Sequence, residues 1–535
     1  MKYAKSMFCI LLSMMLIFEG CQGKQEDKRE LNIIDDNYRT YYEVFLYSYY
    51  DSNGDGIGDI NGLISKLDYI NSDSDKSLGC TGIWLMPIMK STTYHKYDVV
   101  DYYTIDEQYG TMDDFQRLIE ECHKRGINIV IDMVFNHTSD EHEWFVSATD
   151  YLKSLKPGEI PSEADNKYFG YYNFTQTVEN SAVYYEVGNT GWYYEAQFWD
   201  KMPDLNLDNE DVRHEIEGIA KYYIDMGVDG FRLDAAKEFF TGSSDKNIEV
   251  LNWFTNYVKS VKEDTYVVAE VWDSFQTIAA YYKSGIDSIF NYAYGNGEGL
   301  IPAIAKMPDN TKKGERLRDA MLKVQDTFSK NNPNYIDASF ISNHDNNRSS
   351  CYVSNNEDLI KLMAGINLMM SGSSYIYYGE EIGMNGSGAD ENKRLPMYFS
   401  KDDENIPNGP EGATQTISES AFAPVDEQLK DKDSILNYYI RAIRLRNENP
   451  EILRGEVAAC DGEYDDNVCV ITKTYNDSTI VVIYNLSGES KQVTVSKDSC
   501  DYSKIQGYVC NKADEKPSLK GEEITVPAYG IVILK

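Results

Sequence analysis

The chain has 535 residues, 42% of them hydrophobic, and its 87 acidic against 51 basic residues give a formal net charge of −36. This hydrophobic content predicts a packed core and excludes a chain that is disordered throughout. The length accommodates a barrel of typical size together with one or two smaller domains. Strong negative charge repels phosphate backbones and excludes nucleic acid as a partner, whereas it suits an uncharged substrate and divalent cations.

The first residues have the pattern of an export signal. Two lysines and a short apolar run precede Cys21, and a polar segment follows. We predict a signal peptide of the lipoprotein type at 1–21 and a flexible tether at 22–38. The apolar run is too short for a comfortable membrane span. We therefore expect an exported, extracellular monomer that reaches the membrane only through a lipid on Cys21.

Strand and helix patterns alternate along most of the chain. The predicted strands are 42–47, 81–86, 127–134, 228–234, 266–270, 287–292, 339–342 and 374–378. The predicted helices are 60–70, 115–124, 212–226, 247–262, 316–329, 359–370 and 434–447. This alternation is typical of βα units around a parallel sheet. Eight such strands predict the α/β class and a (β/α)8 TIM barrel.

Two segments depart from the alternation. Residues 137–206 are polar, rich in Tyr, Asn and Trp, and too long for a βα loop, so they predict a small inserted domain after the third strand. The barrel would then comprise 39–136 and 207–452. From 453 to 535, short alternating strands predict a C-terminal antiparallel β-sandwich domain. Its two local cysteine pairs, 460/469 and 500/510, leave disulfides and buried thiols both open.

The segment 230–238 combines a short strand with the start of a loop. Asp234 lies where the strand ends, which is the end at which barrels of this kind carry their chemistry. Arg232 lies two residues earlier and so on the same side of the strand. A guanidinium at that distance favours an ionised carboxylate, which a glycosidase nucleophile must be. The alternative is a structural Arg–Asp pair at a strand end.

Polar clusters follow four of the predicted strands. They occupy 132–137, 232–238, 269–272 and 342–345. A closed barrel would bring all four to one rim. Taken singly, each has an ordinary structural explanation, such as a helix-capping aspartate or a hydrogen-bonded histidine.

The loop 51–59 places oxygen-bearing side chains at alternate positions around a glycine-rich turn. Such an arrangement predicts a Ca²⁺ site, and the alternative is a solvated acidic turn. It is not an EF-hand, because Gly62 stands at the twelfth position, where that motif needs a bidentate Glu. The predicted metal residues are Asp51, Asn53, Asp55, Ile57 and Asp59.

Five motifs, in order, resemble glycoside hydrolase family 13, the α-amylase family. They are DMVFNH (132–137), MPDLN (202–206), GFRLDAAKE (230–238), AEVW (269–272) and SNHD (342–345). Supporting pieces are GIWLMP (82–87), YHKYD (94–98) and the loop 51–59. The resemblance covers nearly everything after the tether. It implies a retaining α-glycoside hydrolase that cleaves α-1,4 bonds in starch or maltooligosaccharides.

The resemblance also implies a role for each catalytic residue. Asp234 corresponds to the nucleophile, Glu270 to the acid/base, and Asp345 to the residue that stabilises the oxocarbenium-like transition state. The apolar run before Glu270 helps it to keep a proton for the leaving oxygen. Two such carboxyls about 5–5.5 Å apart give double displacement with retention of configuration.

Seven further residues are expected to contact the substrate. Arg232 would orient Asp234, His137 and His344 would hydrogen-bond sugar hydroxyls, Tyr97 would stack beneath the sugar, and Lys237 would reach the leaving-group side. Asp98 and Arg394 resemble residues that, in exo-acting relatives, close the pocket onto a chain end.

Three features bear on specificity and on a second metal. Glu238 stands where many α-amylases have a His whose carbonyl binds a second calcium, although Asn136 and Asp204 match other ligands of that site. Ala235 resembles the α-1,4-specific members, whereas α-1,6 specialists usually carry Val. The MPDLN motif resembles the branch between neopullulanases and oligo-1,6-glucosidases.

Three alternatives remain open at the level of sequence. One is an exo-acting or oligosaccharide-preferring relative: an α-glucosidase, a neopullulanase-type enzyme or a transglycosylase. The second is a catalytically silent glucan-binding protein on the same scaffold. The third is a calcium-binding adhesion module, which would not hydrolyse anything.

Overall fold

The computed structural model describes the chain except for residues 1–30, 32–33, 179 and 498–499. The predicted signal peptide, Cys21 and most of the predicted tether therefore lie outside the described residues. Within the described part, no helix is long and apolar enough to cross a membrane.

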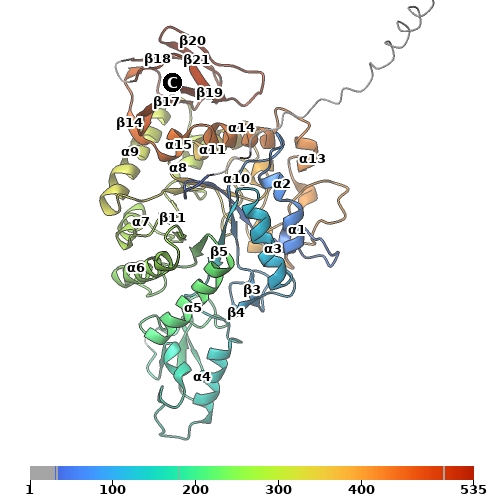
Figure 1. The fold of residues 1–535 in the computed structure, drawn as a ribbon, viewed down its shortest axis with the longest axis vertical. Helices are drawn as coiled ribbons and strands as arrows, with labels where there is room; N and C mark the ends of the chain where they lie inside the picture. The colour runs from blue at the N-terminus through green and yellow to red at the C-terminus, as the bar shows by residue number, and fades with distance from the viewer. Residues whose placement is uncertain (1–30, 32–33, 179, 498–499) are drawn as a thin grey trace, which may run out of the picture.

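Eight parallel strands form the centre of the molecule (Figure 1). Their order is β11-β10-β9-β5-β2-β1-β13-β12, and a bridge between Phe290 and Ala338 joins the two ends. Every one of these strands is buried over almost its whole length, as a parallel sheet covered by helices requires. The strands are β1 (Thr40–Val44), β2 (Gly82–Leu85), β5 (Asn128–Met133), β9 (Gly230–Leu233), β10 (Tyr266–Ala269), β11 (Ser288–Ile289), β12 (Ala338–Ser339) and β13 (Ser373–Tyr377). The predicted barrel is confirmed.

Amphipathic helices surround the barrel. The first predicted helix is interrupted at Lys66 and forms α1 (Ile60–Ser65) and α2 (Leu67–Ile70). A capping box of Thr111 and Asp114 starts α3 (Met112–His123). The others along the barrel are α5 (Glu210–Met226), α6 (Ser244–Val261), α7 (Phe275–Tyr281), α8 (Leu300–Lys306), α9 (Lys313–Asn331), α11 (Glu357–Leu368) and α14 (Ile435–Asn447).

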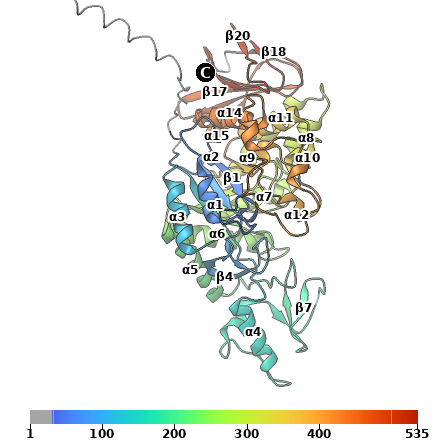
Figure 2. The ribbon, with the colours of Figure 1, turned by 90° about the vertical axis from the view of Figure 1, so that its right-hand side faces the viewer.

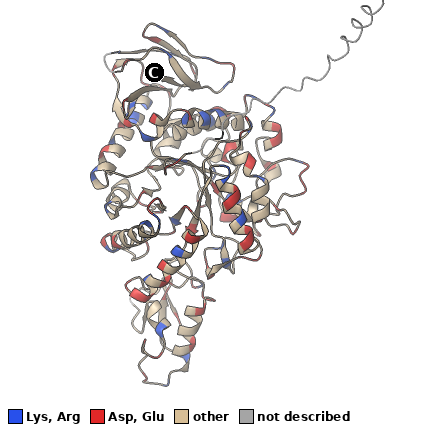
Figure 3. Cartoon of the chain, viewed as in Figure 1, with Lys and Arg blue, Asp and Glu red and all other residues tan. Residues whose placement is uncertain are grey.

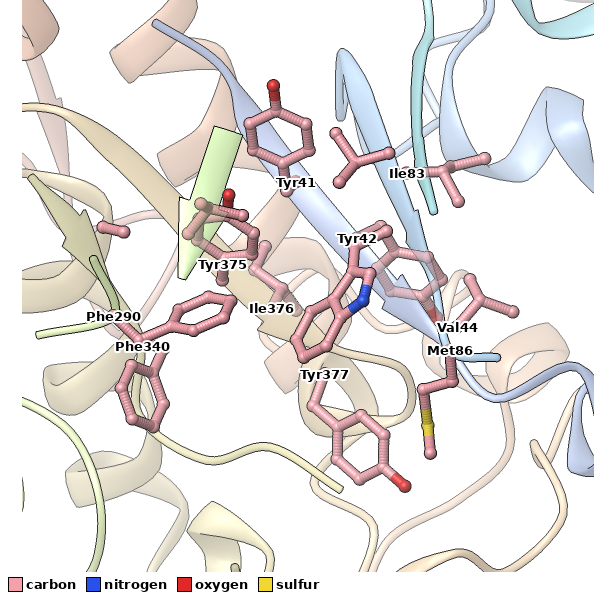
Figure 4. Close-up of a cluster of buried hydrophobic side chains, with 14 of the residues drawn as sticks. Tyr41, Tyr42, Val44, Ile83, Met86, Phe290, Phe340, Tyr375, Ile376 and Tyr377 are labelled. Carbon is pink, nitrogen blue, oxygen red and sulfur yellow. The ribbon is translucent and has the colours of Figure 1, made fainter. Parts of the chain in front are cut away.

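Aromatic rings fill the barrel interior. Tyr41 stacks on Tyr266 and on Tyr375, with ring centroids 5.4 and 4.9 Å apart (Figure 4). Trp84 packs against Phe290 at 5.2 Å. Because side chains alternate along a strand, Glu43, two residues after Tyr41, also points inward, one layer nearer the carboxyl ends of the strands. A rigid apolar layer thus supports the polar rim.

The segment between β5 and β9 projects from the barrel. It contains α4 (Glu143–Ser154) and a small sheet of β6 (Phe174–Thr175), β8 (Tyr193–Glu195) and β7 (Tyr184–Glu186). Figures 1 and 2 show it at the end of the molecule opposite the C-terminal sheets. A bridge between His137 and Asp204 ties together the two ends of this segment.

The last part of the chain forms two antiparallel sheets. One has the order β14-β16-β17-β22-β19 and the other β15-β18-β21-β20. Alternate residues of β16 and β17 face either the second sheet or the barrel helices, so the predicted sandwich is confirmed. The strands are β14 (Glu456–Ala459), β15 (Gly462–Glu463), β16 (Val468–Tyr475), β17 (Ser478–Asn485), β18 (Lys491–Val495), β19 (Ile505–Val509), β20 (Ser518–Lys520), β21 (Glu523–Val526) and β22 (Ile531–Leu534).

The C-terminal cysteines do not form the local pairs that the sequence left open. Cys460 packs between the two sheets, whereas Cys469 faces the barrel. No disulfide joins cysteines in the described part of the chain, and Cys469 and Cys510 are buried thiols. The alternative of buried thiols is the one that the structure supports.

Acidic and basic residues are spread along the outer helices (Figure 3). Many of them pair within one helix, as Lys221 does with Asp225 and Lys330 with Asp326. Exposed pairs of this kind contribute only about 0.3–0.5 kcal/mol each. The barrel and its aromatic interior, rather than surface charge, therefore carry the stability that holds the rim in place.

Candidate active site

The polar clusters predicted from the sequence meet at the carboxyl ends of neighbouring strands. In the barrel β9 pairs with β5 on one side and with β10 on the other. The register sets Arg232 beside Asp132, and Leu233 beside Ala269. Asp234 and Glu270, which directly follow these strands, are therefore brought together as expected.

The guanidinium of Arg232 binds three carboxylates at once. Its Nη1 donates to Asp132 Oδ1 at 2.8 Å and to Asp234 Oδ1 at 2.6 Å, and its Nη2 donates to Glu270 Oε2 at 2.7 Å. The side chain of Arg232 is 1% exposed and lies over the ring of Trp84. One buried cation thus holds Asp234 and Glu270 side by side, which is more than the Arg–Asp pair inferred from the sequence.

Burial shifts the pKa of two carboxyls that contact Arg232. Burial raises the pKa of Glu270, and the negative charges of Asp234 and Asp345 add to the effect although Arg232 opposes it. Burial likewise raises the pKa of Asp132 to about 7, again against the effect of Arg232. A raised pKa favours the protonated form of a carboxyl, which is the form that a general acid needs.

Asp345 lies in a strongly positive environment. Its Oδ2 is 3.1 Å from His344 Nε2, and its Oδ1 accepts from Arg394 Nη2 at 3.1 Å. Burial disfavours the charge of Asp345, but His344, Arg394 and Arg232 outweigh it and hold its pKa well below the ordinary value. Asp345 therefore stays ionised and can stabilise a developing positive charge.

The carboxyls open into a cavity of about 840 Å³. Predicted site residues that line it are Tyr97, His137, Asp234, Lys237, Glu270, Asp345 and Arg394. Residues that the sequence analysis did not assign to the substrate are His95, Phe198, Trp199, Met202, Ala235, Glu238, Trp272 and Asp390. Arg232 and His344 do not line the cavity. They contact carboxyls that do, Arg232 those of Asp234 and Glu270 and His344 that of Asp345.

Two of the residues that line the cavity, His137 and Lys237, have polar side chains that were predicted to contact the substrate. His137 is 1% exposed, and its Nε2 has no hydrogen-bond partner among the described residues. Burial lowers the pKa of His137, so the ring is neutral and Nε2 is available for a hydroxyl. Lys237 is more exposed and donates to the carbonyl of Trp272 at 3.3 Å. Contacts of His137 and Lys237 with the substrate stay predictions.

Asp98 does not face the cavity. Its side chain accepts hydrogen bonds from Ser91, Thr92 and Thr93 and is completely buried. In this structure residues 91–93 occupy both of its oxygens, so a contact of Asp98 with the substrate stays a prediction. Arg394 instead donates from Nη1 to the hydroxyl of Tyr94 at 3.0 Å.

Exposed aromatic rings surround the mouth of the cavity. Phe198, Trp199 and Trp272 are 51%, 44% and 44% exposed. Trp272 stacks on Tyr292 with ring centroids 5.2 Å apart, which fixes its orientation. Rings in this position are suited to stacking on sugars. The sequence contained a signal for these rings, because Phe198 and Trp199 lie within four residues of the start of MPDLN, and Trp272 ends AEVW.

The donor chemistry of the loop 51–59 fits a hard cation, whereas its geometry fits only in part. Asp51 Oδ1 accepts from the backbone N of Asn53 and Gly54, and its Oδ2 accepts from Gly56. Gly54 and Gly56 have positive φ angles, which curl the loop around Asp51. Among the described residues, no three His, Cys, Asp or Glu side chains converge closely enough for a metal. Any ion here would depend on amide and backbone carbonyl oxygens as well.

The matching residues of the second predicted metal site contact each other. Asn136 Nδ2 donates to Asp204 Oδ1 at 3.1 Å, and the backbone N of Gln197 donates to Asp204 Oδ2 at 3.0 Å. Burial raises the pKa of Asp204 well above the ordinary value, helped by Glu195 and Glu238. In this arrangement the pair joins the barrel to the inserted segment directly.

The family model described as "Alpha amylase, catalytic domain" matches residues 43–455, which include this whole site. The chain belongs to the α-amylase family. It is 36% identical over 504 residues to Alpha-amylase 3 of Dictyoglomus thermophilum, covering 92% of each chain. The structure resembles that of Eubacterium rectale Amy13B, with a TM-score of 0.87, 43% identity and 95% and 97% of the two chains covered. It also resembles the α-amylase from H. orenii, with a TM-score of 0.79, 34% identity and coverage of 93% and 99%.

This α-amylase family member is accordingly a glycoside hydrolase that acts on α-glucans. The membership agrees with the polar rim, the cavity and the exposed aromatic rings. It argues against the adhesion module and the silent binding protein considered from the sequence.

Proposed function

We propose that the enzyme cleaves α-1,4-glucosidic bonds by double displacement, with Asp234 as nucleophile and Glu270 as acid/base. The observation that carries the proposal is the shared guanidinium of Arg232, which holds both carboxyls beside one cavity. In the first step an oxygen of Asp234 bonds to the anomeric carbon while the bond to the leaving oxygen breaks. Glu270 gives its proton to that oxygen.

The second step reverses the roles. Glu270, now ionised, takes a proton from water, and the hydroxide oxygen bonds to the anomeric carbon as the bond to Asp234 breaks. The ionised Asp345 faces the positive charge that develops on the sugar in both transition states. Each step inverts the anomeric carbon, so the product retains the α configuration.

The substrate we propose is starch or maltooligosaccharide. The neutral Nε2 of His137 and the ring of Tyr97 would hold the sugar at the cleavage site. Phe198, Trp199 and Trp272 would stack on neighbouring rings, because sugar faces are apolar enough to pack on aromatic rings. Proton NMR of the first product of maltoheptaose tests the mechanism: α-anomer is expected, and initial β-anomer would exclude double displacement.

A second candidate is an enzyme that prefers chain ends or short oligosaccharides. The supporting observation is the pair of hydrogen bonds from Arg394 to Tyr94 and Asp345, which fixes the guanidinium at the wall of the cavity. Product profiles on a maltooligosaccharide series, with pullulan and isomaltose alongside, separate the candidates. An endo-acting enzyme lowers starch viscosity early, whereas an exo-acting enzyme does not.

We also propose a structural Ca²⁺ in the loop 51–59. Asp51, Asn53, Asp55 and Asp59 would supply side-chain oxygens and Ile57 a carbonyl, and the ion would fix the loop without taking part in catalysis. The test is the unfolding temperature in EDTA, in Ca²⁺ and in Mg²⁺. A rise with Ca²⁺ that Asp55→Asn removes supports the site, and an equal unfolding temperature in EDTA and Ca²⁺ excludes it.

Finally, we propose that the enzyme is exported as a monomer and held at the cell membrane by a lipid on Cys21. The support is the sequence pattern of the first 21 residues. Metabolic labelling with a fatty acid, compared between the wild type and Cys21→Ser, tests the anchor. Labelling that persists in Cys21→Ser would exclude it.

A further inference from the structure

A buried carboxylate below the rim has no part in the mechanism described so far. Glu43, on β1, is 1% exposed and does not line the cavity. Its Oε1 lies 2.6 Å from His344 Nδ1 and also accepts from the backbone N of His344 at 3.3 Å. The two residues are 301 positions apart in the chain. Burying a carboxylate inside a barrel is costly unless it is paired, so His344 is the partner that makes Glu43 tolerable.

The other ring nitrogen of His344 faces the catalytic rim. Its Nε2 is 2.7 Å from the Tyr97 hydroxyl and 3.1 Å from Asp345 Oδ2. The ring packs edge-on against Trp84 at 5.6 Å. Because both nitrogens meet oxygen atoms, an imidazole with a proton on each nitrogen satisfies every contact.

The charged and titratable groups around the ring favour that doubly protonated form. Glu43 approaches from β1 and Asp345 follows in the chain, while Asp132 of β5 lies beyond Tyr97. Arg394 and Arg232 are the opposing cations, and Arg394 Nε donates to the backbone carbonyl of His344 rather than to its ring. Burial opposes the charge of His344, but Asp345 and Glu43 outweigh it and raise its pKa to about 9.

We propose that Glu43 is a positioning residue that keeps the imidazole of His344 charged and aimed at Asp345. The charged ring in turn keeps Asp345 ionised and in place for the sugar cation. This inference deepens the proposed role of Asp345 and rests on it.

The type of side chain at position 43 supports the proposal. A neutral amide oxygen would accept the Nδ1 hydrogen equally well and would cost less to bury. What a carboxylate adds is its negative charge, which acts on the protonation of the ring. Burial raises the pKa of Glu43, but the hydrogen bonds and the charge of His344 oppose that rise and favour the ionised carboxylate. A hydrogen-bond chain then extends from Glu43 through His344, Tyr97 and Asp132 to Arg232, which binds both reacting carboxyls.

The test compares Glu43→Gln with Glu381→Gln. Glu381 is an equally buried glutamate that accepts hydrogen bonds from Tyr42 and Tyr69 and does not contact His344. NMR of ¹³C-labelled histidine follows the six rings, and the signal of His344 is the one lost in His344→Gln. The wild-type ring is expected to stay protonated up to pH 8. In Glu43→Gln its midpoint should fall by at least about one pH unit, a tenfold loss of proton affinity, and Glu381→Gln should leave it in place.

Kinetics provide the second readout. Glu43→Gln is expected to lower kcat on maltoheptaose by about 10- to 100-fold, a size typical of groups that orient a reacting side chain. KM should change little, because the ring charge acts on the transition state, and Glu381→Gln should keep both constants. An unchanged midpoint in Glu43→Gln, or a shifted midpoint with unchanged kcat, overturns the proposal. So does a wild-type ring that is neutral at pH 7, which can be read even if Glu43→Gln fails to fold.

The relation between Glu43 and His344 and the role of Asp345 are tested by different measurements. The titration midpoint measures the relation between Glu43 and His344 without reference to turnover. The activity of Asp345→Asn tests the role of Asp345 itself. A shifted midpoint together with a fully active Asp345→Asn would leave the relation in place and remove the proposed function of Asp345.

Discussion

The carboxylate of Asp132 lies 2.8 Å from the guanidinium of Arg232, and the two side chains are 0% and 1% exposed. The same guanidinium binds Asp234 and Glu270. A single cation therefore compensates a group of three carboxyls inside the barrel. Arg232 therefore has two roles: it stabilises the rim of the barrel, and it keeps the two reacting carboxyls next to each other.

Replacing Arg232 by Met should destabilise the fold by about 3–5 kcal/mol at neutral pH, the usual cost of removing one partner of a buried ion pair. The loss should depend on pH. Without the cation the folded-state pKa values of Asp132 and Glu270 rise further above those of the unfolded chain. A carboxyl whose pKa is higher in the folded state destabilises the fold as the pH rises from its unfolded-state pKa to its folded-state pKa. The loss of stability in Arg232→Met should therefore be larger at pH 8 than at pH 5.

Denaturant unfolding at the two pH values measures this effect. The control is Arg213→Met, which breaks a two-point contact with Glu249, a side chain that is 56% exposed. Its cost should be about 0–1 kcal/mol and nearly independent of pH. Equal losses in both variants would show that the three carboxyls do not depend on Arg232.

Local sequence patterns predicted the strands and the polar residues that form the site. They could not predict contacts between residues that are far apart in the sequence. The eight strands are short apolar runs, and their carboxyl ends must share one rim once the barrel closes. Arg232 and Asp234 are two residues apart, so their contact follows from strand geometry. Glu43 and His344 are 301 residues apart, and no spacing in the sequence relates them.

Neighbouring residues in the sequence can have different surroundings in the fold. Asp98 is next to Tyr97 in the chain, yet its carboxylate accepts from Ser91, Thr92 and Thr93, whereas Tyr97 lines the cavity. In the C-terminal domain, the edge strands β15 and β20 consist mainly of exposed residues, which leave no apolar run for a sequence pattern to detect.

Asp234→Asn should lower kcat by more than about 10³-fold, because an amide cannot form the bond to the anomeric carbon. Binding of maltoheptaose should persist, since the amide keeps the shape of the cavity. Calorimetry measures the binding and reducing-sugar release measures the turnover. Asp225→Asn, at an exposed pair on α5, is the control and should behave as the wild type. Unchanged turnover in Asp234→Asn would remove its assignment as nucleophile.

Glu270→Gln should separate substrates by their leaving groups. With maltoheptaose the loss should be about 10²–10⁴-fold, the typical contribution of general acid catalysis. With maltosyl fluoride the leaving fluoride needs no proton in the first step. The rate of this step in Glu270→Gln should therefore stay close to that of the wild type. In the wild type, kcat/KM for maltoheptaose should fall as the pH rises through the raised pKa of Glu270. An equal loss on both substrates would argue against Glu270 as the acid.

Phe198→Ala and Trp272→Ala should raise KM for maltoheptaose by about tenfold each, which corresponds to about 1.4 kcal/mol of lost stacking. Maltose and other short substrates should be affected less, because they reach fewer of the rings. Ile160→Ala is the control, since Ile160 is 87% exposed and does not line the cavity. Initial rates over a series of chain lengths measure the effect. A KM increase that is the same for every length would assign these rings a structural role only.

Ala235 follows the nucleophile with a φ of 48°, a left-handed conformation that is uncommon for any residue with a Cβ. Its backbone N donates to Glu270 Oε2 at 3.2 Å, so the strained turn also helps to orient the acid. Ala235→Val places a branched side chain in this conformation and should cost about 1–3 kcal/mol in stability. The added methyl groups would also narrow the cavity that Ala235 lines, which should raise KM for maltoheptaose more than for isomaltose.

Ala182→Val, at an exposed position with ordinary backbone, should change neither the stability nor the KM. Unfolding curves and kinetics on both sugars measure these effects, and an Ala235→Val enzyme as stable as the wild type would mean that the turn after Asp234 relaxes freely.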